Sequence, residues 1–204
     1  MSTLPPEPPT LILASASPRR RELIQVLGLP YEVAPSAYEE ILPATCDDPV
    51  SLGIELATGK ALDVARAHPG RLVLGADTLV VLDTRIYGKP EDAGDAARML
   101  RELSGRTHQV VTGVAVVVAR GEDVERHAFA TTTDVTFRAL HEREIEAYVA
   151  TGEGLDKAGA YGIQHYGSLI IERVSGDYFN IVGLPLAPLA ALLRGLGLSI
   201  LGLP

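Results

Sequence analysis

The sequence predicts an α/β protein in which helices flank a mixed central sheet. Helical and strand-like segments alternate along the 204 residues, and 47% of the residues are apolar, enough for one good-sized core. Strand-like segments also follow one another directly, as in hairpins, so a mixed sheet fits better than a purely parallel one. Residues 1–9 predict a disordered leader, whereas residues 10–204 contain no repeat or clean linker and predict one bilobed domain with a cleft.

In the N-terminal half, short apolar runs predict strands and apolar residues at helical spacing predict helices. The first helix is well marked, because Ser17 provides an N-cap, Pro18 stands at the first helical position and Gly28 ends the helix. The third strand ends at the sequence Gly-Ala-Asp-Thr, and Asp83 begins the turn of the following hairpin. The expected elements are strands at 10–14, 31–34 and 72–74, helices at 18–27 and 48–68, and a hairpin at 79–87.

The C-terminal half continues the alternation. Ser104 and Gly105 close an amphipathic helix, and two long strands then meet through a polar turn at residues 120–123. A glycine-rich loop at residues 151–167 precedes the last strand, and Pro185 begins the last helix. The expected elements are helices at 92–103, 142–149 and 185–193, and strands at 109–119, 124–137 and 168–174.

Charge and cysteine content exclude several classes of protein. The net charge of −8 argues against a protein that coats nucleic acid, which would need a basic surface. Cys46 is the single cysteine, so no intrachain disulfide or cysteine-based zinc site is expected. The apolar tail at residues 181–204 is interrupted by Arg194 and by several prolines and glycines, which disfavour a membrane-spanning helix. We therefore expect a cytoplasmic protein without membrane or nucleic-acid partners.

The first candidate site is the sequence Ser-Ala-Ser-Pro-Arg-Arg-Arg that starts at Ser15, where a strand passes into a helix. Unpaired N–H groups at a helix N-terminus, together with Ser17, Arg19 and Arg20, make a candidate cradle for phosphates. An ordinary capped helix with solvated arginines explains the same pattern equally well.

Carboxylates form the second candidate. Asp77 stands at the end of the third predicted strand, and ligands of open α/β sheets bind at the carboxyl ends of strands. Glu39 and Glu40 lie in a loop, and carboxylate oxygens suit magnesium. The alternatives are an aspartate that caps its own turn and two solvated glutamates.

Two further segments carry suitable side chains. Lys89, in Gly-Lys-Pro, and Lys60, on the second helix, offer point charges for phosphate, although most exposed lysines are merely solvated. The loop at residues 156–164 has small residues that admit a flat ligand, and Gln164 offers a donor and an acceptor for the edge of a base. A flexible surface loop is the alternative. From residue types alone, the sequence supports magnesium-assisted phosphate chemistry in an α/β cleft.

Taken together, these segments resemble the Maf family of nucleotide pyrophosphatases almost from end to end. The matching stretches are LILASASPRRRELI from Leu11, GADTLVV from Gly75, GKP from Gly88, SGRTHQVVTGV from Ser104, DKAGAYGIQ from Asp156 and VGLPL from Val182. The resemblance implies an elongated mixed sheet like that of the inosine-triphosphate pyrophosphatases, with a cleft between two lobes. It also implies hydrolysis of a nucleoside triphosphate to the monophosphate and pyrophosphate with Mg²⁺ or Mn²⁺, and it suggests a homodimer.

The resemblance also implies roles for individual residues. Asp77 is the acidic catalytic residue, as general base or metal ligand, and Glu40 joins it at the metal. The triphosphate is held by Ser15, Arg20, Lys60 and Lys89, and substrate contacts that set base preference come from Ser17, Arg19, Thr78 and Gln164.

The loop sequence AGAYGIQ is similar to that of family members that act on dTTP and UTP, although His165 stands where a glycine commonly follows the glutamine. Two other functions stay open at this point: specificity for 7-methyl-GTP, and nucleotide binding without turnover in a regulator of cell division and septum formation.

Overall fold

The computed structural model describes residues 10–203, and the predicted leader at residues 1–9 lies outside them. Seven strands form one sheet in the order β2-β1-β3-β5-β6-β7, with β4 paired to β3. β1 is parallel to β2 and β3, and the other neighbours are antiparallel, so the predicted mixed sheet is confirmed. The elements are β1 Leu11–Leu13, α1 Pro18–Gln25, β2 Tyr31–Val33, α2 Pro49–Ala67, β3 Val73–Leu82, β4 Arg85–Tyr87, α3 Ala93–Leu103, β5 Thr107–Arg120, β6 Asp123–Phe137, α4 Glu142–Ala150, the 3-10 helices η1 Ala158–Ala160 and η2 His165–Leu169, β7 Ile171–Ser175, α5 Tyr178–Val182 and α6 Leu186–Gly195.

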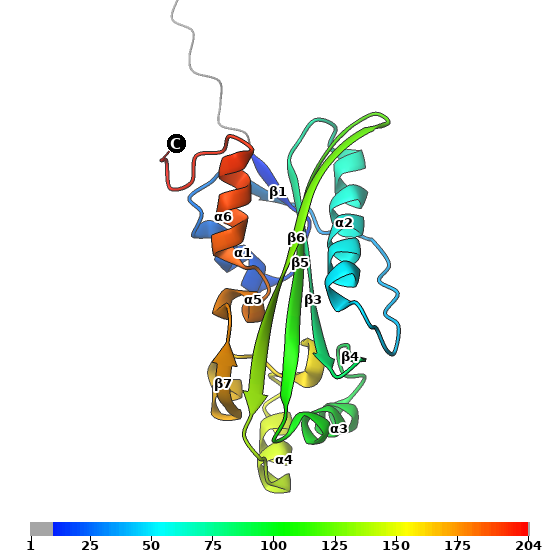
Figure 1. Cartoon of the computed structure of the whole chain (residues 1–204), viewed down its shortest axis with the longest axis vertical. Helices are drawn as coiled ribbons and strands as arrows, with labels where there is room; N and C mark the ends of the chain where they lie inside the picture. Colours follow the sequence, from blue (N-terminus) through cyan, green and yellow to red (C-terminus); the bar gives the residue numbers. More distant parts are fainter. Residues whose placement is uncertain (1–9, 204) are drawn as a thin grey trace, which may run out of the picture.

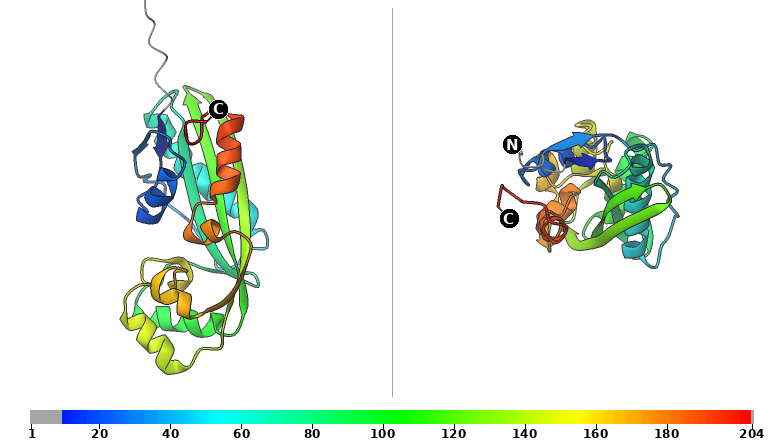
Figure 2. Two further views of the ribbon diagram at one scale, coloured as in Figure 1. Left: turned by 90° about the vertical axis from the view of Figure 1, so that its left-hand side faces the viewer. Right: turned by 90° about the horizontal axis from the view of Figure 1, so that it is seen from above.

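The long hairpin of β5 and β6 gives the molecule its elongated shape (Figure 1). Helices cover both faces of the upper part of the sheet, and seen from above the strands lie between α6 and α2 (Figure 2, right). The strands therefore bury alternate residues on opposite faces. In β1, Leu11 and Leu13 belong to the core under α1 and α6, whereas Ile12 packs with the α2 residues Ala57 and Ala61.

A further core lies at the lower end of the molecule, where α3 and α4 pack against the ends of the long strands (Figure 1). Val80, Val110 and Phe137 of the sheet contribute to it, together with Leu100 of α3 and Tyr161 from the loop after η1. The functional residues described below lie between this core and the upper one.

Helix α2 lies unusually close to the sheet. A Cβ atom at Gly113 would stand 2.0 Å from the carbonyl oxygen of Gly53, and one at Gly75 would stand 2.3 Å from that of Ala57. Glycine on the strands therefore allows helix and sheet backbones to touch. Lys60 follows Ala57 by less than one helical turn. The close backbone contact therefore holds Lys60 over the face of β3 that α2 covers.

Three sequence predictions need correction. The last strand was predicted to begin at residue 168, but Ser168 and Leu169 belong to η2 and β7 begins at Ile171. The predicted strand end at Gly75 is wrong, because β3 runs without a break from Val73 to Leu82. Its small residues are typical of a turn, but they are required here by α2 above and β5 beside them. The short helix α5 was not predicted, since five residues give no measurable periodicity; Asp177 caps it, and Gly183 ends it with φ of 116°. No helix within residues 10–203 is long and apolar enough to cross a membrane.

Candidate active site

A cavity of about 850 Å³ opens between the two parts of the molecule. Its walls come from the start of α1, the middle of β3, α2, the segment after β4 and the loop around η1. The structure brings to this cavity every residue to which the family resemblance gave a role, which are Ser15, Ser17, Arg19, Arg20, Glu40, Lys60, Asp77, Thr78, Lys89 and Gln164. Glu39, the other candidate carboxylate of the loop, is not among the lining residues.

Asp77 lies in the middle of β3, although the sequence predicted it at a strand end. The reason that it still reaches the cavity is the shortness of β1. This parallel neighbour pairs with β3 only as far as Leu13 and Leu74, and the chain then turns away through Ser15 into α1. Asp77 is therefore placed just beyond the carboxyl end of β1, where α/β sheets bind ligands.

An acidic pair on either side of a lysine forms one side of the site. Lys60 Nζ lies 2.6 Å from Oε1 of Glu40 and also pairs with Oδ1 of Asp77. The side chains of Lys60 and Asp77 are 11% and 8% exposed, whereas that of Glu40 is 41% exposed. The lysine thus bridges two carboxylates at the point where they come together and offsets one of their two negative charges.

The loop that carries Glu40 is attached to α2. The carboxylate of Asp63 accepts hydrogen bonds from the Ser36 hydroxyl at 2.7 Å and the Ala37 amide at 2.8 Å. The hydroxyl of Ser36 keeps the pKa of Asp63 below its ordinary value. Tyr38 lies flat against Gly59, where a Cβ atom would overlap its ring. These contacts hold Glu40 beside Lys60, and none of them was predicted.

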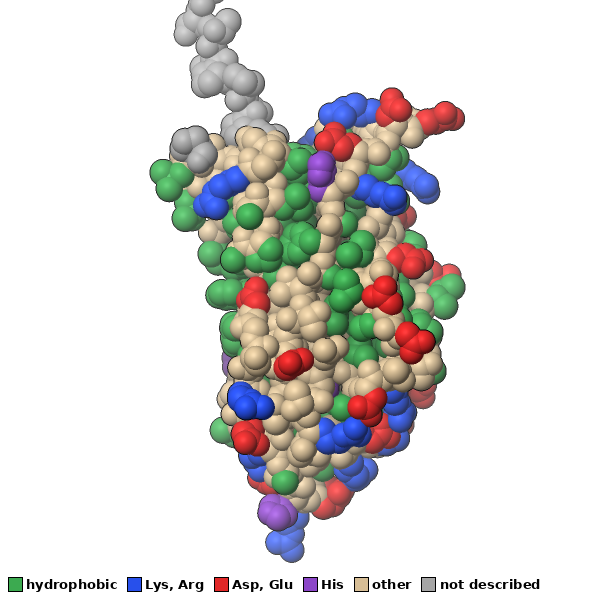
Figure 3. Space-filling view, in the orientation of Figure 1, with side chains coloured by type: hydrophobic (Ala, Val, Ile, Leu, Met, Phe, Trp, Pro, Cys, Tyr) green, Lys and Arg blue, Asp and Glu red, His purple; other side chains and the backbone are tan. Residues whose placement is uncertain are grey.

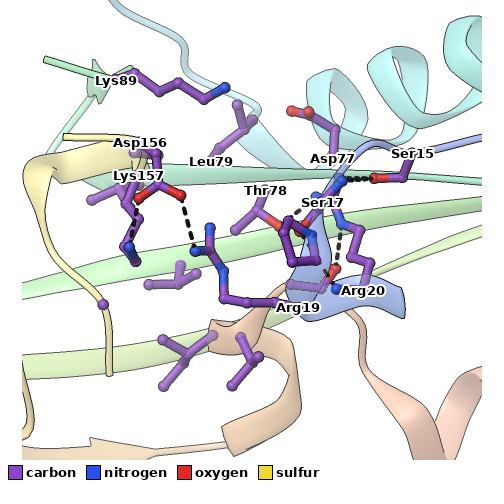
Figure 4. Close-up of a pocket in the computed structure, with 18 of the residues that line it drawn as sticks. Ser15, Ser17, Arg19, Arg20, Asp77, Thr78, Leu79, Lys89, Asp156 and Lys157 are labelled. Carbon is purple, nitrogen blue, oxygen red and sulfur yellow. Dashed lines mark hydrogen bonds and ion pairs between the residues drawn. The ribbon is translucent and has the colours of Figure 1, made fainter. Parts of the chain in front are cut away.

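Arg20 forms the cationic side of the site (Figure 4). Its Nε donates to the carbonyl oxygen of Gly183 at 2.9 Å, and its terminal nitrogens donate to Thr78 at 3.0 Å and Ser15 at 3.4 Å. Burial lowers the pKa of Arg20, while Asp77 and Glu40 act in the opposite direction. An arginine keeps its charge under such a shift, so a fixed cation faces the cavity.

The hydroxyl of Thr78 belongs to a longer network behind Arg20. It lies 3.0 Å from that of Thr112, which donates to the carbonyl oxygen of Asn180 at 2.9 Å. The fully buried Asn180 side chain donates in turn to Val110 and Thr133. This network fixes α5 and, through it, the Gly183 carbonyl that orients Arg20. The sequence showed its members only as parts of separate stretches: Thr78 in GADTLVV, Thr112 in SGRTHQVVTGV, and the end of α5 in VGLPL from Val182.

Arg19 points to the other side of the cavity. Its guanidinium lies 3.3 Å from the carboxylate of Asp156, which also pairs with Lys157 (Figure 4). The pair joins α1 to the loop before η1 across the mouth of the cavity. Lys89 enters the same space from the segment after β4 (Figure 4). Asp156 and Lys157 line the cavity but were not among the predicted site residues.

Residues 10–196 match the family model described as Maf-like protein.

The chain belongs to the Maf family.

It is 52% identical over 196 residues to the dTTP/UTP pyrophosphatase of Deinococcus radiodurans, covering 95% of this chain and 96% of that protein. It is 54% identical over 194 residues to the dTTP/UTP pyrophosphatase of Moorella thermoacetica, covering 94% and 97%. The solved structure of a HAM1 protein from Coxiella burnetii has a TM-score of 0.50 at 14% identity and covers 92% of this chain and 99% of that one. The expected fold, like that of the inosine-triphosphate pyrophosphatases, is confirmed.

The Maf-type loop after η1 shows where this chain departs from the family pattern. His165 has a backbone φ of 51°, in the left-handed region that favours glycine. A glycine commonly follows the glutamine in the similar loops of family members that act on dTTP and UTP, and a glycine would adopt this conformation without strain. His165 lines the cavity beside Gln164, so its imidazole forms part of the wall of the site.

Proposed function

We propose that this Maf-family chain hydrolyses dTTP and UTP to the monophosphate and pyrophosphate. The observation that carries the proposal is the cavity, in which Asp77 and Glu40 stand beside the cationic groups of Arg20, Lys60 and Lys89. Its volume of about 850 Å³ is in the range of small-molecule sites. The relatives from Deinococcus radiodurans and Moorella thermoacetica, both named dTTP/UTP pyrophosphatase, support the same reaction.

The cations of the site address the main obstacle to this hydrolysis, which is the negative charge that repels an attacking nucleophile. Arg20 is held in place by Gly183 and Thr78, so its free edge is oriented before substrate arrives. We assign Arg20, Lys89, Lys60 and the Ser15 hydroxyl to the triphosphate. Asp77 then acts on water as general base or serves as a metal ligand, close to the phosphates in either role.

Asp77 and Glu40 also have the donor chemistry for Mg²⁺ or Mn²⁺. Magnesium binds through one or two carboxylates and completes its coordination with substrate phosphates and water. Residues 10–203 contain no group of three or more His, Cys, Asp or Glu side chains that could hold a metal ion, which fits an ion that arrives with the triphosphate. When bound, such an ion neutralises phosphate charge and polarises the phosphoryl oxygens. Lys60 contacts one oxygen of each carboxylate, so an ion bound between the two would lie next to its positive charge.

Base recognition is assigned to the loop around η1. Gln164 supplies an amide whose carbonyl and NH₂ groups match the edge of a pyrimidine. Arg19 and Ser17 border the same space from α1. Thr78 also lines the cavity, and its hydrogen bond to Arg20 places it at the border with the phosphate side. A nucleic-acid partner receives no support from the face shown in Figure 3, where acidic and basic side chains are interspersed.

The test is pyrophosphate release across uridine, thymidine, cytidine, guanosine and 7-methylguanosine triphosphates, with Mg²⁺ or Mn²⁺. We expect release from dTTP and UTP, and loss of that release in Asp77→Asn while the protein stays folded. Asp123→Asn is the matched control, because this exposed aspartate is the first residue of β6, next to the hairpin turn and outside the cavity lining. Preferred cleavage of 7-methyl-GTP would replace the substrate assignment. Binding without release from folded protein would favour the regulatory function.

A further inference from the structure

A buried histidine lies directly behind the loop that forms the base side of the cavity. His108, near the start of β5, is 1% exposed. Its ring stands edge-on to that of Phe137, with centroids 5.0 Å apart, and to that of Tyr161 at 5.3 Å. No residue described so far as a phosphate or metal contact touches it, so the proposed chemistry leaves this imidazole without a role.

His108 is joined to the loop by a hydrogen bond. Its Nε2 lies 2.7 Å from the hydroxyl of Tyr161, whose side chain is buried and whose ring also packs against Phe137 at 4.7 Å. The Nδ1 atom has no hydrogen-bond partner among residues 10–203. A buried polar atom left unpaired is costly, and apolar residues would fill this space without that cost. The imidazole is therefore better explained by its bond to Tyr161 than by packing.

Tyr161 is the point at which the loop is fixed to the sheet. It stands three residues before Gln164, and Tyr161 and Gln164 both line the cavity. Other contacts hold the flanks of this segment: the Gly159 amide donates to the carbonyl oxygen of Gly88 at 3.0 Å, and the Gly162 amide donates to the Tyr148 hydroxyl at 3.2 Å. After Gln164, the amides of Tyr166 and Gly167 donate to the carboxylate of Glu153, each at 3.0 Å. The Tyr161 side chain is thus the anchor that reaches into the core from the segment just before Gln164, and it acts together with these hydrogen bonds.

The phosphate side of the cavity is anchored independently. Arg20 belongs to α1, Lys60 to α2 and Asp77 to β3, and their hydrogen bonds do not pass through Tyr161 or His108. A change at His108 should consequently alter how the base is read more than how the triphosphate is held.

We propose that His108 is a positioning residue that, through Tyr161, fixes the Gln164 loop for discrimination between 4-oxo and 4-amino pyrimidine nucleotides. The inference rests on the proposed function and adds a determinant of specificity to it. UTP and CTP differ at the base only in the exocyclic group at position 4 and the protonation of N3. A glutamine amide can rotate to match either pattern, so discrimination requires the surrounding backbone to be fixed. Burial lowers the pKa of His108 to about 4, which keeps the imidazole neutral at neutral pH.

The experiment measures the dissociation constants of non-hydrolysable UTP and CTP analogues by calorimetry with Mg²⁺, in wild type, Tyr161→Phe, His108→Phe and the double variant. We expect the ratio of the two constants to move toward one by about fivefold in each single variant, the effect of one neutral hydrogen bond. In the double variant, the ratio of the two dissociation constants should move little further than in either single variant, because both changes remove the same hydrogen bond. The ratio of kcat/KM values for UTP and CTP should follow, while kcat for UTP changes less.

Controls separate positioning from general destabilisation. Val117→Ala removes buried volume at the far end of β5, so it should lower the melting temperature and leave the ratio unchanged. Tyr161→Phe deletes a single oxygen and keeps the ring packing, which protects the test against misfolding. A ratio that stays at the wild-type value in both single variants overturns the inference, even if their melting temperatures fall. Wild-type protein that binds neither analogue refutes the proposed function as well, whereas binding and cleavage with unchanged ratios refute only the role of His108.

Discussion

Replacement of Lys60 by methionine tests the acidic pair without any nucleotide. The lysine side chain is 11% exposed and bridges Asp77, which is 8% exposed, and Glu40, which is 41% exposed. Removing one partner of a buried ion pair costs about 3–5 kcal/mol. Because Glu40 is partly solvated and the cavity admits water, we expect the lower end, about 3 kcal/mol. For a chain of this length, that lowers the melting temperature by roughly 6–12 °C.

The same change should create a cation site that the lysine otherwise fills. In Lys60→Met, Mg²⁺ can take the position between Asp77 and Glu40 without displacing a positive charge. A ligand at 100 times its dissociation constant stabilises the folded state by about 2.7 kcal/mol. Titration with MgCl₂ at constant ionic strength should therefore recover most of the lost melting temperature in the variant and raise that of wild type much less.

Arg98→Met provides the matched control. Arg98 also bridges two carboxylates, those of Asp95 and Glu102, but it lies on the surface of α3 and its side chain is 40% exposed. Exposed ion pairs contribute about 0–1 kcal/mol, so this variant should melt near the wild-type temperature and respond to Mg²⁺ as wild type does. If Mg²⁺ stabilises Lys60→Met no more than Arg98→Met, the carboxylates do not form a metal site.

Three further predictions follow from the backbone and from burial. His165→Gly should raise the free energy of unfolding by about 0.5–1 kcal/mol in urea denaturation, because φ of 51° strains any residue with a Cβ; an equal gain from His165→Ala would contradict that reason. Gly113→Ala should cost about 3 kcal/mol and reduce kcat, because its Cβ would stand 2.0 Å from the Gly53 carbonyl oxygen and push α2 away; Gly195→Ala, with open space around it, is the control. His108 has a pKa of about 4 in the folded protein against about 6.5 when unfolded, so the unfolded state binds more protons between these values. Stability should therefore fall by up to roughly 3 kcal/mol as the pH drops through that window, and His108→Phe should flatten this part of the profile; a persistent slope in the variant would assign it to other groups.

The sequence predicted those parts of the fold that depend on local chemistry. Helix α1 follows from the Ser17 cap and the proline after it, and Ser17 does accept a hydrogen bond from the Arg20 amide. The long hairpin follows from its apolar strands and polar turn. The predicted site residues also reach one cavity: eight of the ten stand in the stretches that carry the family resemblance, and Glu40 and Lys60, which stand outside those stretches, line it as well.

The parts that were missed depend on contacts between distant segments. Asp77 reaches the cavity from the middle of β3 because β1 stops at Leu13, and nothing in the sequence around Asp77 encodes that. The pairing of Arg19 with Asp156 joins residues 137 positions apart, and the bond of His108 to Tyr161 joins residues 53 positions apart. Such pairs follow from the packing of the two parts of the molecule, which local periodicity does not specify.

The central claim is that water cleaves the bond between the α- and β-phosphates of a pyrimidine triphosphate in this cavity. Phosphorus NMR of dTTP incubated with the protein and Mg²⁺ identifies the products directly. We predict that the three triphosphate signals are replaced by those of dTMP and pyrophosphate, that Asp123→Asn behaves in the same way, and that Asp77→Asn leaves dTTP intact. Appearance of dTDP with inorganic phosphate, or equal conversion by folded Asp77→Asn, would contradict the account.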